Sequence, residues 1–247
     1  MIRTATKTLS EQQLQDYDRD GFVIARGLFS PEEIETLRST FMDLVKDGPV
    51  EGLSDVNRIT DKTDPLYQYG RLMHPHVNAK DQAVRDLAMR SMLDQRIHDI
   101  LHDLFGEEPL AAQSMVYFKP PGARGQDLHQ DNFYLRIKPG TCMAAWLAMD
   151  DCDLDNGGMV VVPGSHKLDV LCPDEQSDNE TFFTGHHVDV PEGMETVPAI
   201  MKAGDCLFFT GSVIHGSYPN TSKDRFRRAF ICHYAPTSCE EASRAYQ

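Results

Sequence analysis

The second half of the chain consists of short apolar runs that are repeatedly cut by proline and glycine. The runs include MVYFK, CMAAWLAMD, MVVV, DCLFFT and RRAFICHYA, and they are separated by turn-forming segments such as PPGARG, KPG, NGG and PGSHK. Short runs rich in β-branched and aromatic residues, bounded by turn residues, are typical of strands. Many such strands at short intervals predict an all-β sandwich or barrel from about residue 110 onward.

The first third of the chain has a different, mainly helical pattern. A short polar helix is predicted over residues 10–20, and FVIA at 22–25 is typical of a short strand. The SPEE segment at 30–33 combines a capping serine, a proline suited to the first helical position and a glutamate that can complete a capping box. That helix is expected to stop at Gly48, and a second amphipathic helix is predicted from 81 to 105.

Residues 50–80 lie between these helices and show no clear period. A long irregular segment is often a lid or a binding loop, and a surface wrap explains the pattern equally well. No repeat or low-complexity linker divides the chain. We therefore expect one domain over residues 1–247, with a mostly helical part at about 1–109 and a jelly-roll core at about 110–238. Helices followed by strands predict an α+β fold that is mainly β.

The composition excludes several classes of partner. The 247-residue chain has a formal net charge of −14 and an isoelectric point near 5.0. We expect no nucleic acid and no membrane partner, because both require a basic surface. The N-terminus lacks an apolar signal-peptide core, and no apolar run approaches the ~20 residues needed to cross a bilayer. The cysteines form no C-x-x-C pair, so we expect free thiols and a cytoplasmic location. No sequence pattern indicates the oligomeric state.

A histidine and a carboxylate stand two residues apart in one of the predicted strands, LHQDNFYLRI at 128–137. We expect His129 and Asp131 to project from one face, because alternate residues of a strand share a face. A third candidate, His215, ends an apolar run far along the chain, and the strands between could return it to the first pair. Two histidines and one carboxylate form the facial triad of non-haem Fe(II) enzymes, which leaves coordination positions open.

An arginine cluster follows the turn after His215. Arg227 is predicted on the next strand, and an arginine inside a β-barrel needs an anion, for which the planar guanidinium offers bidentate binding to a carboxylate. By strand alternation Arg225 shares this face and Arg228 takes the other. The alternative interpretation is that Arg225, Arg227 and Arg228 form a basic cluster in contact with solvent.

Two other histidine patterns are weaker candidates for a metal site. His187 and Asp189 repeat the His-x-Asp pattern, but they are too close in sequence to His215 to return across a core. His98 and His102 stand four apart on the predicted helix, away from its apolar stripe, which favours a solvated face.

Several segments together carry a family resemblance: LHQD, AWLAMDD, NGGMVVVPGSHK, AGDCLFF, IHGSYPNTS and FRRAFICHYAP, with DGFVIARGLFSPEEIETLR near the N-terminus. In this order they resemble the phytanoyl-CoA dioxygenase family of Fe(II)/2-oxoglutarate-dependent oxygenases. The likeness covers most of the chain and is weakest at 50–80 and 168–198. It implies a double-stranded β-helix core.

The resemblance also implies the cofactors, Fe(II) and the co-substrate 2-oxoglutarate. It assigns the iron to His129, Asp131 and His215, and the far carboxylate of 2-oxoglutarate to Arg227. The turn after His215 is one residue longer than the usual family pattern, which leaves Arg225 as the second choice for that carboxylate.

Further site residues follow only from the resemblance. Ser217 matches a hydroxyl beside the far carboxylate, Gln126 matches a polar contact to co-substrate or substrate, and Trp146 matches an aromatic residue of the pocket wall.

We therefore expect an Fe(II)- and 2-oxoglutarate-dependent dioxygenase that uses O2 to oxidise a small organic molecule, with succinate and CO2 as products. Halogenating relatives replace the triad carboxylate with a small residue, so Asp131 favours hydroxylation, desaturation or epoxidation. Two alternatives stay open: a cupin-type metal enzyme that does not use 2-oxoglutarate, and a non-catalytic binding module of the same fold. Fatty acyl-CoA, an amino-acid derivative and a secondary metabolite are all open as substrates.

Overall fold

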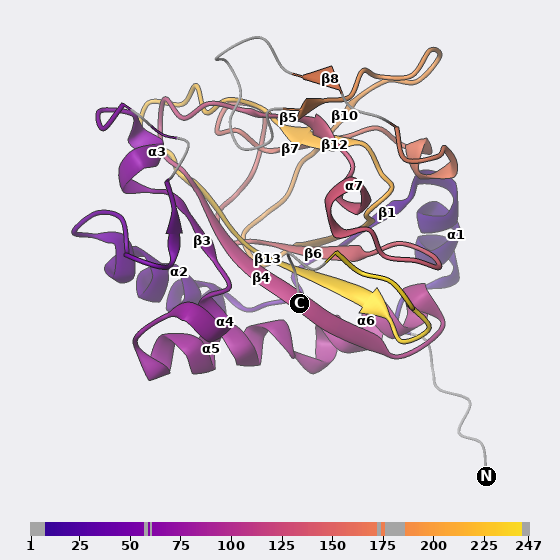
Figure 1. Cartoon of the computed structure of the whole chain (residues 1–247), viewed down its shortest axis with the longest axis horizontal. Helices are drawn as coiled ribbons and strands as arrows, with labels where there is room; N and C mark the ends of the chain where they lie inside the picture. The colour runs from indigo at the N-terminus through magenta and orange to yellow at the C-terminus, as the bar shows by residue number, and fades with distance from the viewer. Residues whose placement is uncertain (1–7, 57–58, 60, 172–173, 176–185, 244–247) are drawn as a thin grey trace.

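Two antiparallel sheets face each other across the core of the computed structural model, which describes residues 8–56, 59, 61–171, 174–175 and 186–243 (Figure 1). The larger sheet has the strand order β1 (Phe22–Ala25), β11 (Cys206–Thr210), β6 (Met143–Ala148), β13 (Arg227–Pro236), β4 (Pro109–Lys119), β3 (Arg71–Met73) and β2 (Ser54–Asp55). The smaller sheet has the order β10 (Val197–Ala199), β7 (Met159–Val161), β12 (His215–Ser217) and β5 (Gln126–His129). A two-stranded ribbon pairs β8 (Asp174–Glu175) with β9 (His186–His187).

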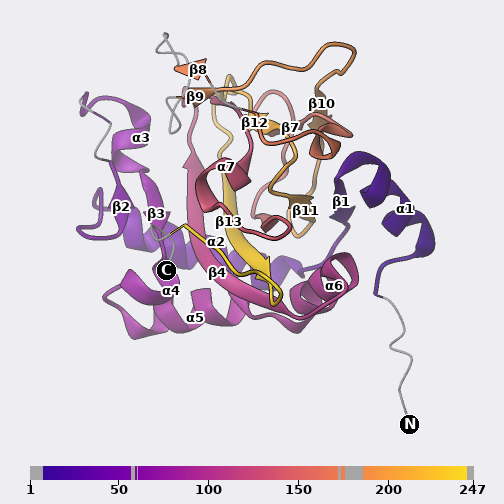
Figure 2. The same cartoon turned by 45° about the vertical axis from the view of Figure 1, so that its right-hand side comes forward.

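Helices cover the outer face of the larger sheet (Figures 1 and 2). This layer consists of α2 (Pro31–Val45), α4 (Pro75–Asn78), α5 (Gln82–Met92) and α6 (Gln95–Phe105). The other helices lie outside this layer: α1 (Glu11–Asp20), α3 (Pro65–Gln68), α7 (Asp131–Leu135) and the 3-10 turn η1 (Ser165–Lys167). Apolar residues of α2, α5 and α6 form one cluster with the outward side chains of β4, β6, β11 and β13. The helical first third of the chain thus supplies the layer that covers this face of the sheet.

Strand alternation divides each long strand of the larger sheet between two apolar clusters. In β4, Val116 and Phe118 pack toward the helices, whereas Met115 and Tyr117 pack between the sheets. Because both faces are buried, these strands appear in the sequence as continuous apolar runs and not as apolar–polar alternation. The same alternation directs Lys119, the last residue of β4, into the space between the sheets.

Two of the expected helices begin as predicted. Ser10 and Ser30 each accept from the backbone N–H three residues on and complete capping boxes at α1 and α2. The single helix expected over 81–105 was wrong, because it is two helices, α5 and α6. Asp94 separates them, since its side chain accepts from the Arg96 backbone N–H at 2.9 Å and caps the start of α6.

Two expectations about extended segments were also wrong. Residues 50–80 were expected to be irregular, but the described part of this segment adds β2 and β3 to the edge of the larger sheet. The strand expected over 128–137 stops at His129, and α7 begins at Asp131. The chain turns there because the Asn132 backbone N–H donates to Gly211 O at 2.9 Å, while the Asn132 side chain accepts from Ile137 N at 3.0 Å.

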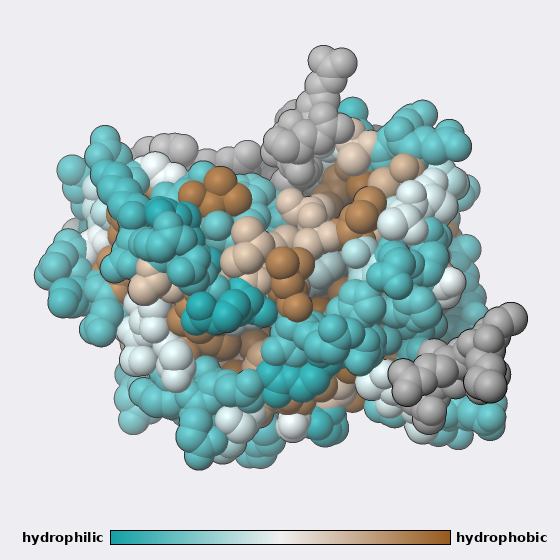
Figure 3. Space-filling view, turned by 90° about the horizontal axis from the view of Figure 1, so that it is seen from below, coloured by the Kyte–Doolittle hydropathy of each residue, from teal (hydrophilic) through white to brown (hydrophobic). Residues whose placement is uncertain are grey.

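The underside of the molecule, which carries α4 and α5, is hydrophilic at its rim and has apolar side chains in its middle (Figure 3). The exposed apolar residues on these helices include Val77 and Met89. Among the described residues, none of the helices has the length and apolar character that a bilayer crossing requires. The five described cysteines are free thiols, and Cys172 lies outside the described residues. The cytoplasmic location stays a prediction.

Substitution of Phe41 by alanine should destabilise the helix layer. Phe41 of α2 is fully buried and stacks on Phe230 of β13 with ring centroids 5.9 Å apart, so its removal leaves a cavity between helix and sheet. We expect the free energy of unfolding to fall by about 3–5 kcal/mol in chemical denaturation. The control, Leu154→Ala at a side chain that is 49% exposed, should change it by less than about 0.5 kcal/mol. Equal effects of the two substitutions would contradict this account of the packing.

Candidate functional site

Three side chains from two strands and a helix meet between the sheets. His129 ends β5 and His215 begins β12, and the two residues are direct partners in the antiparallel ladder. Asp131 lies at the start of α7, and its Oδ1 is 3.5 Å from His129 Nε2 and 3.7 Å from His215 Nε2. The donor atoms of the three residues all lie within 4.8 Å of one another. A turn into a helix therefore achieves the convergence that was expected from one continuous strand.

Backbone carbonyls set the orientation of both imidazoles. The Nδ1–H of His129 donates to Asp127 O at 2.7 Å, and the Nδ1–H of His215 donates to Val213 O at 3.0 Å. The Nε2 lone pair of each ring consequently faces the shared centre, which is the arrangement that a metal ligand requires. The amide Nε2 of Gln126 lies 3.2 Å from His129 Nε2, the nitrogen that faces the shared centre.

The carboxylate of Asp131 is anchored by two residues that the sequence interpretation missed. His233 Nε2 donates to Asp131 Oδ2 at 2.9 Å, and the Gln113 amide donates to His233 Nδ1 at 2.9 Å. One carboxylate oxygen is thus occupied while the other faces the two histidines. Strand alternation carried the signal, because His233 follows Arg227 by an even number of residues on β13 and so shares its inward face.

Electrostatics keep this cluster in the state that binds a cation. Burial alone would raise the pKa of Asp131, but electrostatic interactions with the neighbouring imidazoles and the hydrogen bond from His233 hold it well below its usual range. Burial lowers the pKa of His215 to about 4, against the attraction of Asp131. Near neutral pH the centre therefore offers a carboxylate and an unprotonated His215. Two imidazoles and one carboxylate with protein on one side fit a divalent transition metal such as Fe(II).

A positively charged region adjoins the three residues. Arg227 is 2% exposed, its Nε donates to Gly157 O at 2.9 Å, and its guanidinium lies 5.4 Å from the Trp146 ring centre. Lys119, which the sequence interpretation did not select, donates from Nζ to Ser217 Oγ at 2.7 Å. Burial lowers the pKa of Arg227. Trp146 and Ser217 thus both lie near Arg227, and the roles that the resemblance assigns to these residues stay predictions.

The neighbouring arginines lie elsewhere. Arg225 precedes β13, is partly exposed and pairs with Asp153 at 2.7 Å. Arg228 points to the opposite face and pairs with Asp150 at 2.7 Å. Of the three arginines, Arg227 alone lines the cavity that contains the His129–Asp131–His215 cluster.

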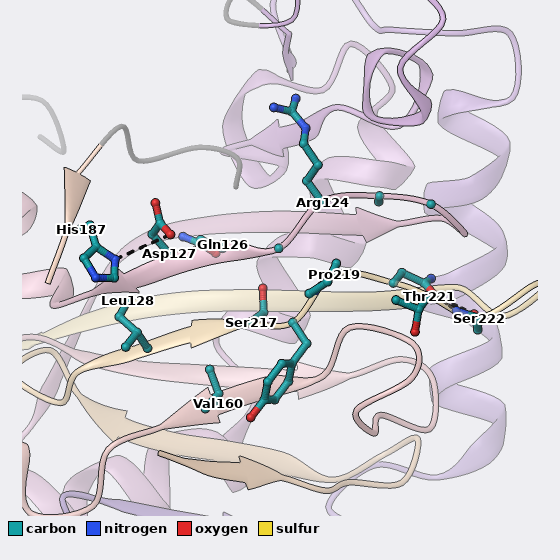
Figure 4. A pocket seen from close by; sticks show the side chains of 15 residues that line it. Arg124, Gln126, Asp127, Leu128, Val160, His187, Ser217, Pro219, Thr221 and Ser222 are labelled. Carbon is teal, nitrogen blue, oxygen red and sulfur yellow. Dashed lines mark hydrogen bonds and ion pairs between the residues drawn. The ribbon is translucent and has the colours of Figure 1, made fainter. Parts of the chain in front are cut away.

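An inner cavity and a larger outer cavity adjoin the site. The inner one is lined by Met115, Tyr117, Gln126, His129, Asp131, Trp146, Met159, Phe209, His215, Arg227, Ile231 and His233. A larger cavity of about 720 Å³ lies beside β5, β12, the loop that precedes β5 and the loop that follows β12, and none of the three clustered side chains lines it. Figure 4 shows Arg124, His187 and Pro219 around this larger cavity. Gln126 and Ser217 line it too, and Gln126 also lines the inner cavity.

The weaker histidine candidates do not join the cluster. His187 of β9 is 3.7 Å from Asp127 and 3.1 Å from Asp189. On α6, His98 contacts Asp99 at 3.0 Å and Glu108 at 2.9 Å on a partly exposed face.

Comparison with known proteins identifies the family. Residues 17–229 match the sequence profile described as Phytanoyl-CoA dioxygenase (PhyH). The chain is 28% identical to Phytanoyl-CoA dioxygenase 1 of Oryza sativa subsp. japonica, over 94% of this chain and 92% of that protein.

Solved structures share the fold. The epimerase SnoN of nogalamycin biosynthesis, in complex with Fe3+ and alpha ketoglutarate, superimposes with a TM-score of 0.71 and 22% identity over 93% of this chain and 84% of SnoN. EctD from S. alaskensis gives a TM-score of 0.73 and 20% identity over 98% of this chain and 82% of EctD. The expected jelly-roll core is confirmed. The chain belongs to the phytanoyl-CoA dioxygenase family and is an Fe(II)- and 2-oxoglutarate-dependent dioxygenase.

Proposed function

We propose that this protein hydroxylates a small organic molecule at an iron held by His129, Asp131 and His215. The observation that carries the proposal is the convergence of the two Nε2 atoms on Asp131 Oδ1, with both Nδ1 atoms tied to backbone carbonyls. We also propose that residues 1–247 form one domain. In support, β1, β2 and β3 of the first third lie in the same sheet as β4 and β13.

The proposed co-substrate position lies at the Arg227 end of the inner cavity. When bound, Fe(II) and 2-oxoglutarate supply O2 activation coupled to loss of CO2 and formation of succinate. In the proposal, the guanidinium of Arg227 forms a salt bridge with the far carboxylate of 2-oxoglutarate, and the Ser217 hydroxyl donates a hydrogen bond to the same carboxylate. An inner cavity bounded by apolar side chains such as Phe209 and Ile231 keeps water from the reacting centre.

A cupin-type enzyme without 2-oxoglutarate is less well supported, because it gives a buried arginine such as Arg227 no anion to bind. A non-catalytic module is opposed by the intact set of metal-ligand types, since the donor atoms of His129, Asp131 and His215 all lie within 4.8 Å of one another.

The geometry favours hydroxylation, desaturation or epoxidation over halogenation. Asp131 fills the third protein position and is held there by His233, so a halide has no vacant place on the protein side. The fold alone does not decide the outcome, since SnoN is described as an epimerase. The larger cavity, at about 720 Å³, has the size of a small-molecule site and contacts the centre through Gln126. We assign the substrate to it.

Replacement of Asp131 by alanine should abolish iron binding. Without the carboxylate, two neutral imidazoles form a weak site for a divalent cation. We expect wild-type protein reconstituted anaerobically with Fe(II) to retain iron after desalting and to develop a visible absorption band with 2-oxoglutarate. Asp131→Ala should do neither. Asp189→Ala, at the exposed carboxylate of the second His-x-Asp pair, should behave as wild type. Iron retention and a normal band in Asp131→Ala would refute the assignment.

Replacement of His233 by leucine should weaken iron binding without abolishing it. His233 lies behind Asp131 and donates to its Oδ2, and loss of such an outer contact typically lowers metal affinity about 10–100-fold. Competition with a chelator of known affinity measures the change. An unchanged affinity would show that Asp131 is positioned without His233.

A further inference from the structure

Lys119 and Arg227 are two buried cations side by side. They are direct cross-strand partners in the pairing of β4 with β13, and their exposed fractions are only 5% and 2%. Within the described part of the chain, neither forms an ion pair with a carboxylate. Lys119 donates to Ser217 Oγ and Tyr218 O, and Arg227 donates to Gly157 O. Two buried positive charges on neighbouring strands lower the stability of the fold unless an anion binds between them.

The backbone at Gly157 leaves just enough space for the Lys119 side chain. Gly157 has a φ of +81°, and a Cβ built there would clash with Lys119 Cδ, so a side chain at 157 would displace the lysine. The carbonyl of the same glycine accepts from Arg227 Nε at 2.9 Å. Gly157 therefore leaves space for the Lys119 side chain, and its carbonyl orients the guanidinium of Arg227.

The hydrogen bonds leave donors free for an anion. Lys119 Nζ donates to Ser217 Oγ at 2.7 Å, which occupies an acceptor lone pair and leaves the Ser217 O–H to donate elsewhere. Arg227 uses Nε for Gly157, so the two terminal nitrogens of its guanidinium stay available for a bidentate contact. A small cavity lined by Lys119, Arg227 and Ser217 joins these groups, and Gln126 lines it as well.

We propose that Lys119 is a second cation of the co-substrate site, which binds the far carboxylate of 2-oxoglutarate jointly with Arg227 and orients Ser217 toward it. This inference rests on the proposed function. Burial and the nearby Arg227 both lower the pKa of Lys119 well below its usual value, which is consistent with an ammonium that lacks its counter-ion. In a protein of net charge −14, paired cations also provide a local attraction for a dianion.

The alternative is a lysine that only supports the fold through Ser217 and Tyr218. The two roles differ in what they do to ligands with and without the far carboxylate. 2-Oxopentanoate has the same carbon chain and 2-oxo acid group as 2-oxoglutarate but lacks that carboxylate. A supporting role affects both ligands alike, whereas a carboxylate contact affects only 2-oxoglutarate.

The test is an anaerobic titration of each 2-oxo acid into Fe(II)-loaded protein, followed by the visible absorption band or by displacement. For Lys119→Met we expect the Kd of 2-oxoglutarate to rise about 10–100-fold, the range for a lost charge-assisted hydrogen bond. The Kd of 2-oxopentanoate should change less than about threefold. The preference for 2-oxoglutarate, which is the ratio of the 2-oxopentanoate Kd to the 2-oxoglutarate Kd, should therefore collapse toward one. Lys119→Gln, which keeps a donor for Ser217, should show the same collapse.

Control variants test whether the effect on ligand binding is specific to Lys119 or follows from the loss of any lysine charge. Lys202→Met removes an exposed lysine paired with Asp151 and should leave both constants unchanged. In Lys119→Met combined with Arg227→Met, the loss should differ from the sum of the single losses, because the two side chains share one carboxylate.

An equal weakening of both ligands in Lys119→Met and Lys119→Gln, or no weakening at all, overturns the inference while leaving the proposed function intact. A wild-type protein that loads iron but binds neither 2-oxo acid overturns the proposed function and this inference with it. Collapse of the ratio in the lysine variants, with iron affinity unchanged, supports Lys119 as a carboxylate-binding residue.

Discussion

The pairing of β12 with β5 is the interaction on which the rest of the site depends. It places His215 directly opposite His129, and a shift of one residue would turn one ring to the outer face of the smaller sheet. Gly216 helps to keep the register, because a Cβ there would lie 2.6 Å from Gln126 O. The distance between the imidazoles is therefore a property of the sheet, and Asp131 is added from a helix that begins two residues after His129.

The space between the sheets combines polar groups of opposite charge in an otherwise apolar core. At one end the Asp131 carboxylate is held by His233 and Gln113; at the other Lys119 and Arg227 have no described carboxylate partner. Burial of unpaired charge lowers stability unless a ligand compensates it. A cation-binding cluster and an anion-binding cluster between the same two sheets are what a metal ion and an anionic metal-chelating ligand require together. Binding of both should consequently stabilise the fold by mass action.

Sequence reasoning succeeded where the signal was local. Capping serines placed the starts of α1 and α2, and apolar runs between turn residues indicated the strands of the core. It was wrong over residues 128–137, where contacts to Gly211 override the extended propensity, and over 81–105, where Asp94 divides the helix. It missed Lys119 and Gln113, because their roles depend on cross-strand register. It also missed His233, although even spacing from Arg227 within one strand indicates a shared face.

The sequence by itself determined the residue types at His129, Asp131, His215 and Arg227 and the family to which they point, because these motifs are short and keep their order along the chain. Only the tertiary structure decided that Arg227 and not Arg225 enters the cavity, that a helix carries Asp131, and that Lys119 lies beside Arg227. Those outcomes depend on which face of which strand is buried, and burial is decided by packing between segments that are distant in sequence.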